Sequence, residues 1–116
     1  MSFKTSHTLK ERIIESHRIL TKYPERIPVI VEQCSNSPQN LPDLERSKFL
    51  VPDNITCGQF LYIIRNRIQL SPDKAMFLFI NDLLPTPSSL MKEIYEEHKD
   101  EDKFLYCSYS SESTFG

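Results

Sequence analysis

Glycine is scarce in this chain of 116 residues, where it occurs only at positions 58 and 116. A loop that cradles phosphate groups needs several glycines close together, so that its backbone can approach the ligand. The histidines, at positions 7, 17 and 98, are scattered and lack the cysteine, serine or helical spacing of a nucleophilic pair or a zinc site. The sequence therefore predicts a protein that is not an enzyme, holds no metal and needs no cofactor.

Cysteine is sparse and unpatterned. The chain has Cys34, Cys57 and Cys107, an odd number that indicates a reducing compartment rather than a disulfide framework. Cys57 lies just inside a predicted helix N-terminus, where the pKa of a thiol can be lowered. A semi-buried structural thiol is the alternative, and it is the interpretation we prefer.

Long apolar runs are missing as well. The longest, such as residues 75–80, are far shorter than the roughly 20 residues that a membrane-spanning helix needs. The first five residues lack the apolar stretch of a signal peptide. Any membrane association is therefore expected to be acquired from outside the chain.

Charge is nearly balanced overall but unevenly distributed. The formal net charge is only −2, which points to neither nucleic acid nor a membrane surface. Residues 1–30 hold six basic and three acidic side chains, whereas residues 71–116 hold four lysines and nine acidic side chains. This division either steers different partners to different faces or is a chance segregation of solvated surfaces, and the sequence leaves both open.

Helix and strand signals alternate along the chain. Thr8 and Glu11 have the spacing of a capping box, and Leu9, Ile13 and Leu20 follow with helical spacing, which predicts a helix over 8–21. The other elements are predicted in the same way: runs of β-branched and aromatic residues indicate strands, and capping residues and prolines mark where elements begin or end. These are strands at 27–31, 48–51, 76–80 and 104–109, a long helix from Thr56 to Ser71, and a short helix at 90–95.

This order predicts an α+β fold of the ubiquitin-like β-grasp type, in which a mixed four-stranded sheet grips one helix. A right-handed crossover lets the last strand lie parallel to the first, in the middle of the sheet. We expect one domain, with an N-terminal helical extension over 1–24, a core over 25–109 and a flexible tail over 110–116.

The strand at 76–80 is apolar on both faces. Met76, Leu78 and Ile80 can face the long helix, which leaves Phe77 and Phe79 on the other side. These two rings are either covered by the N-terminal helix or exposed as a patch for a partner or a membrane. The sequence does not decide between the alternatives.

The chain ends in a polar tail and Gly116, a residue without Cβ that can thread a narrow enzyme cleft. Together with the predicted core, this ending resembles the autophagy ubiquitin-like modifiers, the group that contains the GABA-receptor-associated protein. The resemblance covers nearly the whole chain. It is densest in the segments at 23–30, 48–52, 58–67, 77–81, 94–100 and 114–116.

The resemblance implies a function in conjugation. It implies that an activating enzyme and a conjugating enzyme transfer Gly116 to phosphatidylethanolamine, and that a processing cysteine protease recognises Thr114, Phe115 and Gly116. The expected protein is a monomer in the cytoplasm before conjugation and lies on the autophagosomal membrane after it. A lipid with two acyl chains can hold a domain on a bilayer stably.

The resemblance also implies that cargo receptors and adaptors bind through short aromatic-x-x-aliphatic motifs, each added as a strand beside residues 48–52. The pocket for the aromatic side chain is expected to comprise Glu15, Ile19, Pro28, Ile30, Lys48, Leu50 and Phe104. The pocket for the aliphatic one is expected to comprise Phe49, Val51, Pro52, Ile55, Phe60 and Ile63. Acidic peptide residues are expected to meet Arg26, Arg46, Lys48 and Arg67. Because Leu50 and Phe49 face opposite ways on a strand, the two pockets must flank its edge.

Some positions depart from the family pattern. Residues 37–40 lengthen a loop, Ser47 replaces a common basic residue, and Lys103 and Ser111 stand where glycine is usual. The turn before the last strand is therefore expected to be either strained or differently shaped. Two alternatives to a lipid-conjugated modifier are a modifier attached to protein lysines and a β-grasp interaction domain that is never conjugated.

Overall fold

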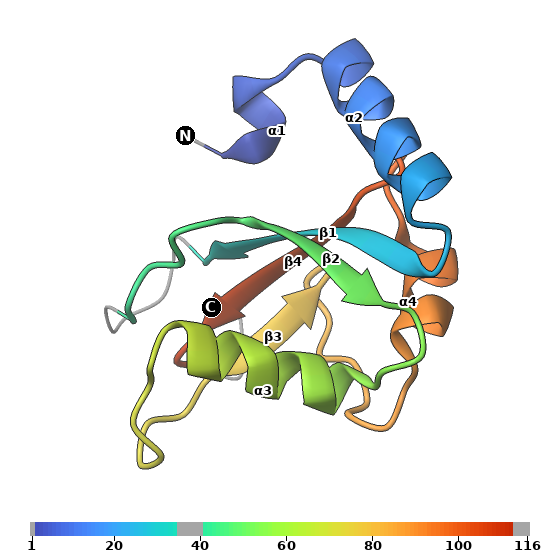
Figure 1. Ribbon diagram of the computed structural model, residues 1–116. Helices are drawn as coiled ribbons and strands as arrows, with labels where there is room; N and C mark the ends of the chain where they lie inside the picture. Colours follow the sequence, from blue (N-terminus) through green and yellow to red (C-terminus); the bar gives the residue numbers. More distant parts are fainter. Residues whose placement is uncertain (1, 35–40, 113–116) are drawn as a thin grey trace.

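A mixed four-stranded sheet forms the centre of the computed structural model, which describes residues 2–34 and 41–112. The strands follow the order β2-β1-β4-β3, where β1 and β4 are parallel and the outer pairs are antiparallel (Figure 1). Their bounds are Arg26–Gln33 for β1, Lys48–Pro52 for β2, Phe77–Ile80 for β3 and Leu105–Ser110 for β4. The predicted β-grasp arrangement, with the first and last strands paired in the middle, is confirmed.

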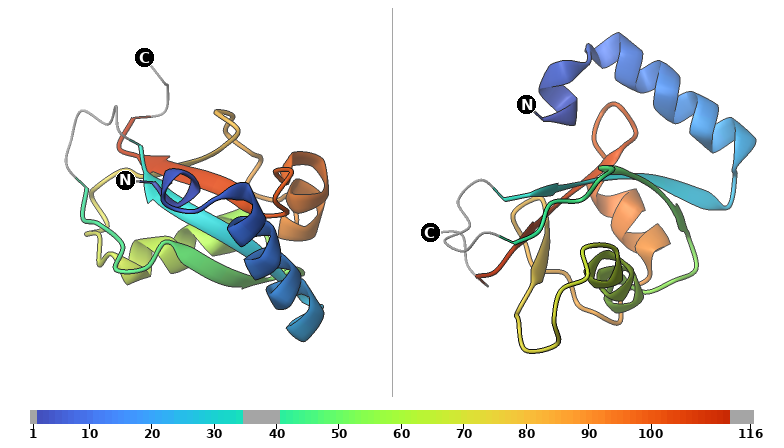
Figure 2. Two further views of the ribbon diagram at one scale, coloured as in Figure 1. Left: turned by 90° about the horizontal axis from the view of Figure 1, so that it is seen from above. Right: turned by 60° about the vertical axis from the view of Figure 1, so that its left-hand side comes forward.

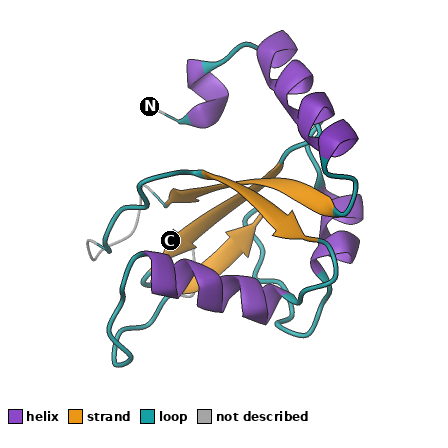
Figure 3. Ribbon diagram, in the orientation of Figure 1, coloured by secondary structure: helices purple, strands orange, loops and turns teal. Residues whose placement is uncertain are grey.

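Helix α3, Cys57–Arg67, covers one face of the sheet, and α4, Met91–His98, packs into the same apolar cluster (Figure 3). The predicted capping box starts α3, because Thr56 and Gln59 each bond the other's backbone amide. Gly58 lets the first turn of α3 approach the backbone of Pro87 closely. Its N–H donates to the carbonyl of Pro87, and an added Cβ would lie 3.3 Å from that oxygen.

The α3-face cluster is the main core. Its centre is Phe60 and Ile64 of α3 against Val29 of β1 and Leu105 of β4, none of which exposes any measurable surface. Alternate residues of each strand point into it, as the period of two in a strand requires. Burying such a cluster is the main favourable contribution to folding.

The N-terminal extension lies on the opposite face of the sheet (Figure 2). It consists of α1, Phe3–Ser6, and α2, Leu9–Lys22, and the capping box of Thr8 and Glu11 begins α2 as predicted. The apolar spacing that predicted this helix does not mark its buried face. Leu9 and Ile13 are 38% and 41% exposed, whereas the buried residues are Arg12, Ser16 and Ile19.

Some boundaries differ from the sequence prediction. Residues 3–6 form a helical turn closed by Ser2 and Thr5. Ser110 belongs to β4 rather than to the tail, because it pairs with Phe77 and is buried. Lys103 has φ 73°, the left-handed conformation that glycine adopts without strain, so the expected strained turn is present. The lengthened loop at 37–40 lies outside the described residues, in which no helix has the length and apolar character to cross a bilayer.

Candidate functional site

Strand β2, Lys48–Pro52, consists entirely of residues that the sequence assigned to the expected peptide site, and its outer edge is described first. Among the described residues, β2 pairs only with β1. The amide of Val31 donates to the carbonyl of Ser47, and the amide of Asp53 donates to the carbonyl of Glu25. Since directly bonded pairs alternate along an antiparallel ladder, the backbone groups of Lys48 and Leu50 point away from β1. The edge therefore turns two N–H groups and two carbonyls outward, and the carbonyl of Leu50 already accepts a hydrogen bond from the Arg26 side chain.

Side chains of β2 divide between the two faces of the sheet. Leu50 pairs with Pro28, and Lys48 pairs with Ile30, so these four side chains share the face covered by α2. Phe49 pairs with Val29 on the face covered by α3. This division agrees with the expectation that two pockets would flank the edge.

On the first face a small apolar group, the α2-face cluster, reaches the edge. Ile19, Ile30 and Phe104 are fully buried, and Leu50 is half-buried against them together with Phe3 and Tyr106. The Phe3 ring stands edge-on to Phe104, with centroids 5.1 Å apart. The residues expected to form the aromatic pocket are thus brought together, with Pro28 also buried and with Glu15 and Lys48 at the rim.

On the second face, Phe49 and Ile55 lie half-buried against the cluster that contains Val51 and Phe60. Pro52 is half-buried at the end of β2 and, two residues after Leu50, faces the α2 side by strand alternation. The Phe49 and Phe60 rings meet edge-to-face with centroids 5.7 Å apart. Ile63 is half-buried on α3. Four of the residues expected to form the aliphatic pocket, Phe49, Val51, Ile55 and Phe60, therefore lie together on this face, with Val51 and Phe60 buried and the other two half-buried.

Positive charges surround this edge. The Arg67 guanidinium stacks over the Phe49 ring at 5.7 Å, and Arg26 donates from Nη1 to the carbonyl of Leu50 at 3.2 Å. Lys48 Nζ lies 3.5 Å from a carboxylate oxygen of Glu15. Arg46, which was expected to join them, is exposed in the loop before β2. An acidic peptide would meet favourable charge along the edge.

Glu15 is the acidic group within this basic surrounding. Partial burial pushes its pKa up, but the hydrogen bond from Arg18 and the charges of Lys48 and Arg18 outweigh burial, and the pKa lies below its ordinary value. The Glu15 carboxylate therefore stays ionised at neutral pH, where it can accept a hydrogen bond or hold Lys48.

A buried polar group fixes α2 on the sheet, and the sequence prediction missed it. Asp102 is fully buried and accepts hydrogen bonds from Arg12 Nη1 and from the Tyr106 hydroxyl, each at 2.5 Å. The Ser16 hydroxyl donates to the Asp102 carbonyl at 2.6 Å. In the sequence, the sign of this group is that Arg12 and Ser16 are four residues apart and so lie on one side of a helix. The same spacing is expected for two polar residues on a solvent-exposed face.

Phe77 and Phe79 differ in exposure. Phe79 is only 3% exposed and Phe77 is half-buried, and neither belongs to the α2-face cluster. Phe79 therefore offers little of its ring to a partner. A role of this pair in contacting a partner or a membrane stays a prediction and now depends mainly on Phe77.

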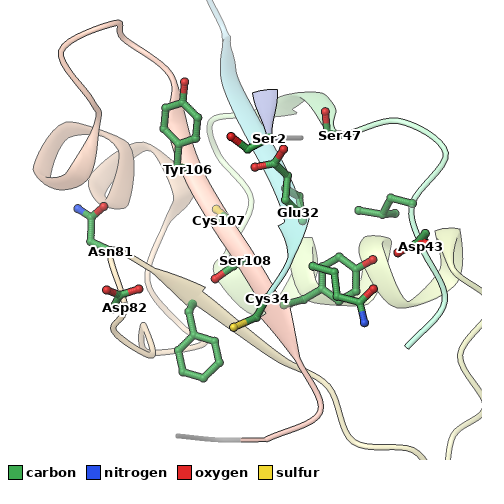
Figure 4. A pocket seen from close by; sticks show the side chains of 15 residues that line it. Ser2, Glu32, Cys34, Asp43, Ser47, Asn81, Asp82, Tyr106, Cys107 and Ser108 are labelled. Carbon is green, nitrogen blue, oxygen red and sulfur yellow. The ribbon is translucent and has the colours of Figure 1, made fainter. Parts of the chain in front are cut away.

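A hollow of about 940 Å³ lies over the C-terminal part of β1 and the middle of β4 (Figure 4). Its acidic lining side chains are Glu32, Asp43 and Asp82, and Glu32 already accepts a hydrogen bond from the backbone amide of Phe3. In the part of the chain that the structure describes, no three histidine, cysteine or acidic side chains are grouped so as to hold a metal ion.

Cys57 does not have an activated thiol. Burial raises its pKa to about 11, so the alternative of a thiol made reactive by the helix N-terminus is wrong. The residues expected to carry the conjugation chemistry, Thr114, Phe115 and Gly116, lie outside the described residues.

Several known proteins are similar to this chain in sequence and fold. Residues 11–116 match the family described as autophagy protein Atg8, ubiquitin-like. Autophagy-related protein 8d of Arabidopsis thaliana is 56% identical, over 99% of this chain and 94% of that protein. Autophagy-related protein 8 of Mycosarcoma maydis is 51% identical, over 99% of this chain and 96% of that protein. The crystal structure of ATG8 from Trypanosoma brucei superposes with a TM-score of 0.90 at 41% identity and covers 100% of this chain and 98% of its own. The chain matches these relatives over nearly its whole length and has the same fold as the solved structure. It therefore belongs to the Atg8 family of ubiquitin-like autophagy proteins.

Proposed function

We propose that this chain is a non-catalytic modifier that is conjugated through Gly116 to phosphatidylethanolamine and recruits cargo receptors and adaptors to autophagosomal membranes. The observation that carries the recruiting part is the free edge of β2, which has an apolar cluster at Leu50 on one face and at Phe49 on the other. An extended peptide added to this edge would place alternate side chains on opposite faces. An aromatic-x-x-aliphatic motif supplies side chains at two such positions.

The conjugation chemistry belongs to partner enzymes. The Gly116 carboxylate attacks the α-phosphate of ATP to give an acyl-adenylate and pyrophosphate, and a cysteine thiolate of the activating enzyme then displaces AMP. The acyl group passes to a cysteine of the conjugating enzyme. The amine of phosphatidylethanolamine finally attacks that thioester, which forms an amide and releases the thiol. A processing cysteine protease hydrolyses the amide and returns the free carboxylate.

Conjugation is tested with purified activating and conjugating enzymes, ATP and vesicles that contain phosphatidylethanolamine. The proposal predicts a product heavier by one phosphatidylethanolamine less one water, measured by mass spectrometry, and no product with a variant that lacks Gly116. Absence of the product would contradict the proposal. A ladder of conjugates on protein lysines would support the alternative of a protein modifier.

Recruitment is tested by calorimetry with an acidic aromatic-x-x-aliphatic peptide. Leu50→Ala removes a rim side chain of the α2-face cluster and should weaken binding by about 1–3 kcal/mol if Leu50 is a central anchor. Leu84→Ala is the matched control, because Leu84 is an exposed leucine outside both clusters. Equal affinities for the Leu50 variant and the unaltered chain would remove Leu50 from the site.

A further inference from the structure

The turn that follows β3 presents two leucines in succession to solvent. Leu83 and Leu84 are 61% and 50% exposed, and neither belongs to the α3-face cluster or the α2-face cluster. Scattered single apolar residues are normal on a protein surface. Two large ones side by side form an apolar patch, which is a feature of surfaces that bind a partner.

The backbone of this turn is held in one conformation. Ile80 and Leu83 exchange two backbone hydrogen bonds, of 2.9 and 3.0 Å, around Asn81 and Asp82. Both central residues have positive φ, 51° and 63°, as a tight type I′ hairpin turn requires. The side-chain nitrogen of Asn81 also lies 3.2 Å from Nδ1 of His98, at the end of α4. A surface that is fixed before binding loses less conformational entropy when a partner docks.

The charges beside the leucines are acidic. Asp82 directly precedes Leu83, and the Glu97 carboxylate lies 3.5 Å from the His98 ring that contacts the turn. Glu93 is one helical turn before Glu97 and therefore lies on the same side of α4. Neither Asp82 nor Glu93 forms an ion pair with any residue that the structure describes. We call the surface formed by Asp82, Leu83, Leu84, Glu93 and Glu97 the β3–α4 surface.

Lysines of this region lie elsewhere. Successive residues of a helix are about 100° apart, so Lys92 and Lys99 fall on the other side of α4 from Glu97. There, Lys99 Nζ bonds Glu96 at 2.9 Å. The hollow that Asp82 helps to line contains no lysine, arginine or histidine among its lining residues (Figure 4). The negative charge beside the leucines is therefore largely uncompensated.

We propose that the β3–α4 surface is a second docking site, which binds a basic amphipathic helix of a partner protein. The apolar side of such a helix covers Leu83 and Leu84, while its lysines or arginines meet the carboxylates. Glu93 and Glu97 are about 6 Å apart along α4, which matches basic residues four apart on a helix that lies alongside. Opposite charges guide this encounter and disfavour wrong partners. The same carboxylates repel an anionic bilayer or a nucleic acid.

This surface and the β2 edge lie on opposite sides of the molecule, because the strand order β2-β1-β4-β3 places β2 and β3 at opposite edges of the sheet. The β2 edge has positive charge around it and suits an acidic peptide, whereas the β3–α4 surface suits a basic one. The uneven charge of the two ends of the sequence then has a purpose, since each end attracts a different partner. Both sites can be occupied at once.

The test uses a labelled synthetic helix of leucine and lysine, and a matched helix in which every lysine is glutamate. Fluorescence anisotropy with the full, unconjugated chain should show binding of the lysine peptide alone. Replacing Leu83 and Leu84 together by serine should weaken that binding about tenfold. Ile14→Ser should not, although Ile14 is equally exposed at 60%. No binding of the lysine peptide, equal binding of both peptides, or an unchanged affinity of the double leucine variant would overturn the proposal.

The contribution of charge is measured with two pairs of variants that change the net charge equally. Glu93→Gln combined with Glu97→Gln should weaken binding of the lysine peptide about fivefold at low salt. Glu25→Gln combined with Glu45→Gln, at exposed positions outside the β3–α4 surface, should have little effect. Equal losses in the two pairs would show attraction to the overall charge of the chain and would overturn the proposal.

Amide chemical shifts locate the contact. The lysine peptide should shift the amides of Leu83, Leu84 and Glu97 and leave those of Lys48 and Leu50 unchanged. The reverse pattern would overturn the proposal. The same shifts on concentrating the chain without peptide would identify a second copy as the occupant, which would also overturn it. No lipid, conjugating enzyme or aromatic-x-x-aliphatic peptide is used, so the result is independent of the proposed function.

Discussion

The two faces of the sheet are covered in different ways. On one face, α3 and α4 complete an apolar cluster of eighteen buried residues. On the other, α2 contributes to a cluster of three buried residues and is also held by the buried Arg12–Asp102 ion pair. A buried ion pair specifies geometry well but adds little net stability, because both charges lose their hydration. The α3 face therefore contributes most of the stability of the fold, whereas the α2 face positions a helix beside the outer edge of β2.

The largest expected effect contrasts the two clusters directly. Phe60→Ala empties the centre of the α3-face cluster and should lower the free energy of unfolding by about 3–5 kcal/mol. Ile19→Ala in the α2-face cluster should cost about 2–4 kcal/mol, since fewer buried neighbours surround it. Denaturant unfolding measures both losses, and a larger loss for Ile19→Ala would show that the α2-face cluster contributes more to stability than the α3-face cluster.

Next in size is the loss of the ion pair. Arg12→Met keeps the length of the side chain but leaves the Asp102 carboxylate buried without its cation. Hydrogen exchange should become faster for the amides of α2 and remain unchanged for those of α3. Equal acceleration in both helices would mean that the ion pair supports the whole fold. Ile14→Met is the matched control, because Ile14 lies on the exposed side of the same helix.

Acid should loosen the α2 side before the α3 side. The pKa of Glu15 is lowered by Arg18 and Lys48, and the pKa of Asp100 by its hydrogen bond from Lys4, in both cases against the effect of partial burial. A carboxyl whose pKa is lower in the folded than in the unfolded state stabilises the folded state at pH above about 4. This stabilisation is lost as the pH falls through the folded-state pKa. Helix α3 itself carries no acidic side chain. Amide chemical shifts followed from neutral to acidic pH should change first in α1 and α2, and a simultaneous change in α3 would count against this account.

The smallest expected effect is a gain. Lys103 has φ 73° in the turn that carries Asp102, and Lys103→Gly should relieve part of that strain. The expected increase in the free energy of unfolding is about 0.5–1 kcal/mol, measured by denaturant unfolding. A loss of stability would show that packing by the Lys103 side chain outweighs the backbone strain.

Sequence reasoning recovered the α3 face better than the α2 face. The order of strands and the start of α3 followed from apolar spacing and from Thr56 and Gln59, because both signals are local. The contact of Arg12 with Asp102 joins residues ninety positions apart and leaves no periodic pattern. Apolar spacing in α2 even pointed to Leu9 and Ile13, which are exposed. At the candidate site, strand alternation predicted that Leu50 and Phe49 face opposite sides of the sheet. That the backbone N–H and carbonyl of Lys48 point away from β1 could not be predicted, because it depends on the register between β1 and β2.

Addition of a short peptide as a strand to the edge of β2 would be seen in amide hydrogen exchange measured with and without an aromatic-x-x-aliphatic peptide. The amides of Lys48 and Leu50 point outward and should become protected when the peptide binds. Those of Phe49 and Val51 face β1 and should change little. Binding that protects neither outward amide, or that protects all four equally, would contradict strand addition at this edge.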